Sequence, residues 1–168
     1  MTTGGPRSAL EGVGLLAIGL LLVQIGLVLP DIDQRIPFIG HRSALTHSVL
    51  LPLLLAGRWP AIAGLLAGGI AVHLGADLLP RGWFGYALVR VPFLGPLDAT
   101  LSQLFLAANA VVGLHLFHAA SREPATRRML WAMLAVSAAA YLLVHERWWP
   151  LVLAAVALAT VVVVWRRR

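Results

Sequence analysis

Six side chains that can bind a metal ion lie between residues 31 and 77 of this sequence. They are Asp31, Asp33, His41, His47, His73 and Asp77. The residues around them are almost all apolar, and charged residues make up only 12% of the chain. Carboxylates together with neutral histidines suit ions such as Zn²⁺, Mn²⁺ and Fe²⁺. The concentration of these residue types in so apolar a sequence predicts a divalent metal site, with Zn²⁺ or Mn²⁺ as the leading candidates.

The spacing of these residues indicates how a metal site could form. His73 and Asp77 are four residues apart in an apolar segment, so a helix would place them on one face. The six residues supply enough ligands for two metals, which Asp31 or Asp33 could bridge. A metal with an open coordination position activates water and polarises a phosphoryl or acyl oxygen, which is the chemistry of a hydrolase.

Two further polar residues are candidates for catalytic roles beside the metal ligands. Arg42 follows His41 directly, and a guanidinium there could clamp a substrate phosphate. Thr46 precedes His47 and could orient the ligands. The sequence offers no cysteine, which excludes both disulfides and thiolate metal sites.

The composition is too apolar for an ordinary soluble domain. The chain has 168 residues, of which 60% are hydrophobic, and a mean hydropathy of +0.85. All thirteen basic residues are Arg, and the formal net charge is +6. Because most of these arginines flank apolar segments, we expect them to meet lipid headgroups and not nucleic acid.

The apolar pattern predicts an all-α, multi-pass membrane bundle that forms one domain over residues 1–168. About six helices are expected to cross the bilayer. Their predicted ranges are 12–29, 43–57, 61–79, 99–120, 129–144 and 151–165. Ser43 and Asp98 are candidate N-caps of the second and fourth spans, and Pro60 suits the first turn of the third.

This topology places the candidate ligands at one depth. Asp31 and Asp33 follow the end of the first span, His47 lies near the start of the second, and His73 and Asp77 lie near the end of the third. With a rise of 1.5 Å per residue, all lie within roughly 10 Å of the same membrane face. More arginines flank the side that carries the termini, so the positive-inside rule predicts cytoplasmic termini in a plasma membrane, with the metal site facing outward.

Three motifs in this region resemble a known family, the predicted membrane-bound, metal-dependent hydrolases, which include a LexA-regulated inner-membrane protein of bacteria. The motifs are Leu29-Pro30-Asp31-Ile32-Asp33, His41-Arg42-Ser43-Ala44-Leu45-Thr46-His47-Ser48 and His73-Leu74-Gly75-Ala76-Asp77. Ser43 stands where the family usually has Gly, and Pro80 where it often has Thr. The family often has an early His as well, and here that region offers only Glu11, which either replaces this ligand or leaves the site one ligand short. The resemblance implies a helical membrane protein with a divalent metal.

The function expected from these observations is metal-dependent hydrolysis of a membrane-associated ester. The depth of the site and the neighbouring arginines favour a phosphoester of a lipid or a lipid-linked molecule. An alternative is a metal-ion or proton transporter that uses the same Asp/His cluster, with a polar path continuing through residues such as Gln24, Asn109 and His118. A third interpretation is a structural membrane protein without catalysis.

Overall fold

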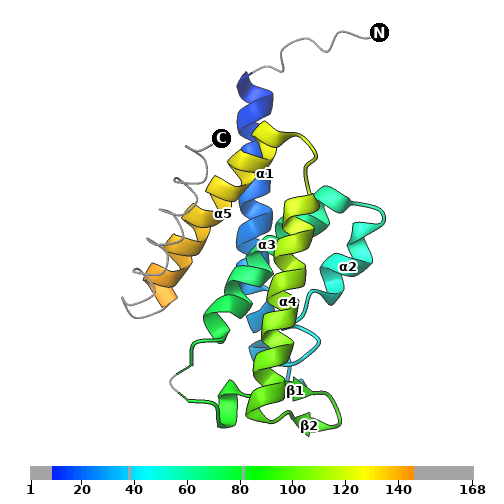
Figure 1. Cartoon of the computed structure of the whole chain (residues 1–168), viewed down its shortest axis with the longest axis vertical. Coiled ribbons are helices and arrows are strands. Elements are labelled where there is room, and N and C mark those ends of the chain that lie inside the picture. The colour runs from blue at the N-terminus through cyan, green and yellow to red at the C-terminus, as the bar shows by residue number, and fades with distance from the viewer. Residues whose placement is uncertain (1–8, 38, 81, 146–168) are drawn as a thin grey trace.

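The computed structural model describes residues 9–37, 39–80 and 82–145, and helices make up most of them (Figure 1). In chain order, the elements are α1 (Ala9–Val28), the 3₁₀-helix η1 (Pro30–Arg35), α2 (Leu50–Ala56), α3 (Pro60–Asp77), the 3₁₀-helix η2 (Gly85–Ala87), β1 (Arg90–Val91), β2 (Gly95–Pro96), α4 (Ala99–Ala119) and α5 (Pro124–His145). The expected predominance of helix is therefore confirmed. The described strands form one short antiparallel hairpin, in which Arg90 pairs with Pro96.

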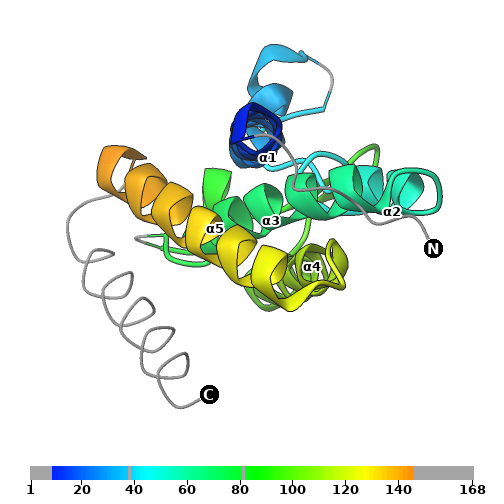
Figure 2. The ribbon, with the colours of Figure 1, turned by 90° about the horizontal axis from the view of Figure 1, so that it is seen from above.

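Helix α3 lies between α1 and α4, as the view from above shows (Figure 2). Small residues allow the helices to approach this closely. Gly69 of α3 lies against the backbone of Val23 and Leu27 in α1, and Gly26 lies against the backbone of α3. On the other face of α3, Gly68 packs against the ring of Phe117 from α4.

Three of the described helices are long and apolar enough to cross a membrane, namely α3, α4 and, within α5, Pro124–Val144. The apolar part of α1, Val13–Val28, is shorter. Large apolar side chains such as Val111 and Val136 are exposed on these helices. Such apolar surface suits contact with lipid, so the helices indicate a membrane protein. The predicted span at 151–165 lies outside the described residues.

The predicted span over 43–57 requires correction, because helix α2 covers only Leu50–Ala56. Residues 41–49, here called the turn segment, form turns and bends instead of a helix. Hydrogen bonds from this segment to Asp33, described below, hold it in that irregular path. Ser43 is consequently not the N-cap of α2, whose first turn follows Val49. The amide oxygen of Asn109 in α4 accepts a hydrogen bond from the Val49 N–H, at 3.0 Å.

The connection between α3 and α4 is fastened to the turn segment and to α4. The Ala44 N–H donates to the carbonyl of Arg90 at 2.8 Å, and the Arg90 N–H donates to the carbonyl of Arg42 at 2.9 Å. The N–H of the buried Val89 donates to the Ser102 hydroxyl at 3.0 Å. Asp98 caps α4 by accepting from the Leu101 N–H, as predicted. These bonds fix the loop that covers one side of the site.

We predict that Gly69→Ala destabilises the protein, because the new Cβ would overlap the Val23 carbonyl oxygen and lie 2.8 Å from the Leu27 nitrogen. Forcing α1 and α3 apart should lower the free energy of unfolding by about 1–3 kcal/mol. Gly75→Ala in the same helix is the matched control, because no neighbouring heavy atom lies within 4 Å of its new Cβ. Thermal unfolding in detergent, followed by circular dichroism, measures both variants. An equal effect of the two substitutions would contradict the packing argument.

Candidate metal centre

Five polar atoms converge at one end of the bundle, and each is buried without a hydrogen-bond partner among the described residues. They are Asp33 Oδ1, His41 Nδ1, His47 Nε2, His73 Nε2 and Asp77 Oδ2. They come from η1, the turn segment and α3, which meet here (Figure 1). A buried polar atom without a partner is unfavourable, so a convergence of five requires an explanation.

The more enclosed part of the cluster is formed by two histidines and two carboxylates. His47 Nε2 and His73 Nε2 lie 3.3 and 3.5 Å from Asp77 Oδ2. Asp31 Oδ1 is 4.0 Å from His73 Nε2. The ligand atoms that Asp31, His47 and His73 offer all lie within 4.8 Å of one another. Both imidazoles are buried, whereas Asp31 is half-buried.

The other ring nitrogen of each histidine is bound to the protein, which orients the ring. His73 Nδ1 lies 2.8 Å from the Leu27 carbonyl oxygen and 2.9 Å from the Tyr141 hydroxyl. Because a carbonyl can only accept, the bond to Leu27 places the proton on Nδ1 and leaves the Nε2 lone pair facing the site. His47 Nδ1 is 3.1 Å from Asp33 Oδ2, which has the same effect. Such outer partners are typical of histidines that bind metal.

The Asp33 carboxylate organises the turn segment. Its Oδ2 accepts from the Ser43 N–H at 2.9 Å and from the Thr46 hydroxyl at 3.0 Å, besides its contact with His47. Burial alone would raise the pKa of Asp33, but the hydrogen bonds from His47, Ser43 and Thr46 outweigh it and hold the pKa below its ordinary value. Asp33 is therefore an anion whose second oxygen, Oδ1, is still available to a cation.

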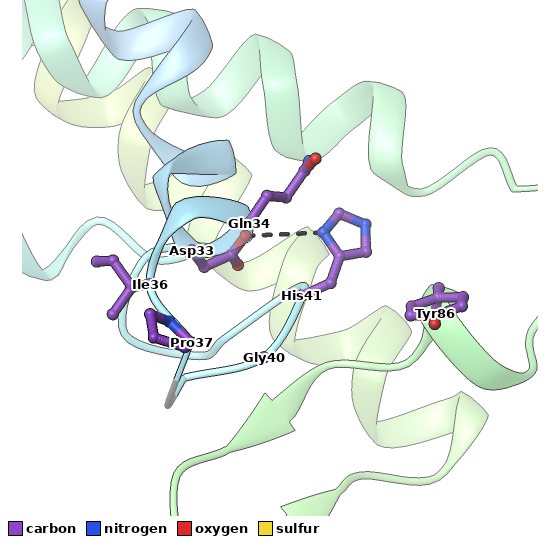
Figure 3. Close-up of a pocket in the computed structure, with 7 residues that line it drawn as sticks. All are labelled: Asp33, Gln34, Ile36, Pro37, Gly40, His41 and Tyr86. Atoms are coloured by element: carbon purple, nitrogen blue, oxygen red, sulfur yellow. Dashed lines mark ion pairs between the residues drawn. The ribbon is translucent and has the colours of Figure 1, made fainter.

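The second part of the cluster faces an open pocket of about 460 Å³ (Figure 3). Asp33 Oδ1 lies 3.6 Å from His41 Nδ1, and one ligand atom each from Asp31, Asp33 and His41 lie within 4.8 Å of one another. The Gln34 amide donates to Asp31 Oδ1 at 2.7 Å and steadies this carboxylate. The pocket is lined by Asp33, Gln34, Ile36, Pro37, Gly40, His41 and Tyr86.

Arg42 points toward α3. Its backbone has a φ of 55°, in the left-handed region, and its guanidinium is buried. One terminal nitrogen donates to Asp77 Oδ1 at 2.6 Å, and the other donates to the Ala87 carbonyl at 2.7 Å. The side chain therefore holds Asp77 in place, and its remaining nitrogen, Nε, has no partner among the described residues. Its predicted contact with a substrate phosphate stays a prediction.

The structure separates other polar residues from the site. Glu11 lies in the first turns of α1, whose other end precedes Asp31, so about 25 Å of helix lies between them. This distance rules out Glu11 as a replacement ligand. Gln24 donates to Ser137 at 3.3 Å, and His118 contacts Arg127 at 2.9 Å.

Sequence reasoning missed three residues that shape the site: Gln34, Tyr86 and Tyr141. Tyr141 contacts His73 across 68 positions of sequence. The only signal for Tyr141 in the sequence is a tyrosine within the apolar stretch 138–144, because a buried hydroxyl usually finds a polar partner.

The donor set fits a divalent cation. Three carboxylates, those of Asp31, Asp33 and Asp77, meet one guanidinium, that of Arg42, so the cluster has an excess of negative charge. Two ligands held about 2.1 Å from one ion at a tetrahedral angle lie about 3.4 Å apart. The separations of 3.3, 3.5 and 3.6 Å within the cluster are close to that value.

We predict that Arg42→Met destabilises the protein in the absence of substrate. The change leaves the carboxylate of Asp77 without its closest cation and cuts the link to Ala87, which should lower the free energy of unfolding by roughly 2–4 kcal/mol. Arg35→Met, at an exposed position of η1, is the control. Unchanged thermal unfolding of Arg42→Met in detergent would show that the arginine has no positioning role.

Comparisons with known proteins do not assign this site. No protein-family model matches the sequence, and neither the search of curated proteins nor the search of solved structures found a match. The three motifs that resemble the membrane-bound hydrolases thus remain a prediction, and the chemistry must be argued from the geometry of the site itself.

Proposed function

We propose that this protein is a membrane-embedded, metal-dependent hydrolase that acts on an ester, specifically a phosphoester of a lipid or lipid-linked molecule. The observation that carries the proposal is the presence of five buried, unpartnered ligand atoms in one cluster of side chains. A divalent metal bound there supplies a Lewis acid and activates water near neutral pH, which is the chemistry that ester hydrolysis requires.

The residues of the chain have separate tasks in this proposal. His47 and His73 bind the ion through Nε2, with Asp31 and Asp77 as the neighbouring carboxylates. Asp33 and the Leu27 carbonyl keep the two rings in the required tautomer. Hydrolysis then forms a bond from water oxygen to phosphorus and breaks the bond to the alcohol, which leaves with a proton.

The surroundings of the pocket favour a substrate that is itself in the membrane. Phe84, Tyr86, Phe93 and Leu94 are all exposed in the loop between α3 and α4, and Tyr86 lines the pocket. Aromatic and apolar side chains at the end of a membrane helix bundle are typical of the interface with lipid headgroups. A plasma-membrane location and an outward-facing site belong to this same proposal.

The geometry favours hydrolysis over transport. A transport path would need polar side chains that are free to continue from the site toward the other end of the bundle. Gln24 is instead engaged with Ser137, Asn109 with the Val49 N–H, and His118 with Arg127. The pocket opens beside the cluster, which suits a substrate that arrives and leaves on the same side.

Purified protein tests the proposal directly. We expect metal in the detergent-solubilised protein by elemental mass spectrometry, and hydrolysis of lipid phosphomonoesters or phosphodiesters in mixed micelles. His47→Ala and His73→Ala should lose this metal and lower kcat/KM by more than about 100-fold. Replacing a residue that only hydrogen-bonds to a metal ligand typically costs about 10–100-fold. His115→Ala, at an exposed position of α4, should retain both properties.

Two results would contradict the proposal. Protein that contains no metal, even after reconstitution with Zn²⁺, Mn²⁺ or Fe²⁺, would exclude the metal-dependent mechanism. Bound metal with no ester hydrolysis, combined with metal uptake by proteoliposomes that His73→Ala abolishes, would establish a transporter in place of a hydrolase.

A further inference from the structure

We infer that the site binds two divalent ions that share Asp31, one enclosed between His47 and His73 and a second one at the mouth of the pocket, held by Asp31, Asp33 and His41. The inference rests on the metal site of the proposed function and adds a second site with a different task. In this arrangement the ion at the pocket is the one that meets the anionic oxygen of the substrate.

The grouping of the ligand atoms supports two positions. Asp31, His47 and His73 form one set of ligand atoms within 4.8 Å of one another, and Asp31, Asp33 and His41 form another. Asp31 is the member that the two sets have in common. A carboxylate has two oxygens and can bridge two ions, which in two-metal hydrolases lie about 3.5–4 Å apart.

The second position has its own unpartnered donor atoms. The side chain of Asp33 is fully buried, and its Oδ2 is saturated by Ser43, Thr46 and His47. Its Oδ1 has no hydrogen-bond partner among the described residues, and neither has His41 Nδ1, 3.6 Å away. That separation is too long for a hydrogen bond but suits two ligands of one ion. Burying a carboxylate oxygen without a partner is unfavourable unless a cation meets it.

The two positions differ in their access to solvent. His47 and His73 are buried, whereas 30% of the His41 side chain is exposed, and it lines the pocket with Asp33. An ion at His41 would therefore exchange more readily than the enclosed one. Apart from His41, none of the residues lining the pocket is basic, so a phosphate entering it would find its positive partner in this ion.

Metal stoichiometry distinguishes the two sites without relying on activity. Chelator-stripped full-length protein in detergent is dialysed against Zn²⁺, and bound metal is counted by elemental mass spectrometry. We expect two equivalents in wild type and in the control His115→Ala, but one in His41→Ala and in the conservative variant His41→Gln. With Mn²⁺ in place of Zn²⁺, the coupled two-ion electron paramagnetic resonance signal of wild type should become that of isolated Mn²⁺ in both His41 variants.

The outcomes separate this inference from the proposed function. One equivalent in wild type, unchanged in His41→Ala and lost in His73→Ala, would overturn the second site and leave the single-metal hydrolase standing. No metal in any protein would overturn both. Because His41 is partly exposed, its replacement leaves the buried core intact, and size-exclusion chromatography checks that the variants fold.

Discussion

Acceptor atoms that face one another in a buried site need a positive charge between them. The structure around the candidate metal site depends on this electrostatic constraint. His47 Nε2 and His73 Nε2 lie 3.3 and 3.5 Å from Asp77 Oδ2, while the Leu27 carbonyl and Asp33 orient the two rings. Each of these outer bonds places a ring proton away from the cluster. The Nε2 atoms that face the site are therefore left as acceptors, an arrangement that suits a cation.

The sequence predicted best what depends on local spacing. His73 and Asp77 share a helical face because they are four residues apart, and Asp98 caps α4 because a short acidic side chain can reach the N–H of the first turn. The argument from depth put the acids after α1 near the end of α3, because helix rise converts residue number into height. It placed His47 on a helix, whereas this residue lies in the turn segment before α2.

Features that depend on tertiary contacts escaped prediction. The apolar character of residues 43–57 suggested one continuous helix, but the hydrogen bonds that Asp33 accepts from Ser43 and Thr46 hold the first part in turns. No pattern in the sequence indicates that Arg42 turns inward to Asp77. Tyr141 is a similar case, since its contact with His73 exists only because α5 packs beside α1 and α3.

A non-helical segment inside a membrane helix bundle is tolerated only where its backbone N–H and C=O groups find partners within the protein. Asp33 bonds to the turn segment, Asn109 bonds to its end, and Arg90 bonds to Ala44 near its start. A helix over the same residues would have satisfied the backbone without any of these partners, but it would project successive side chains around its circumference. The turn segment instead sends His41 to the pocket and His47 to the enclosed ligands. Because this segment is not helical, one short stretch of chain can supply a ligand to the open part of the site and another to the enclosed part.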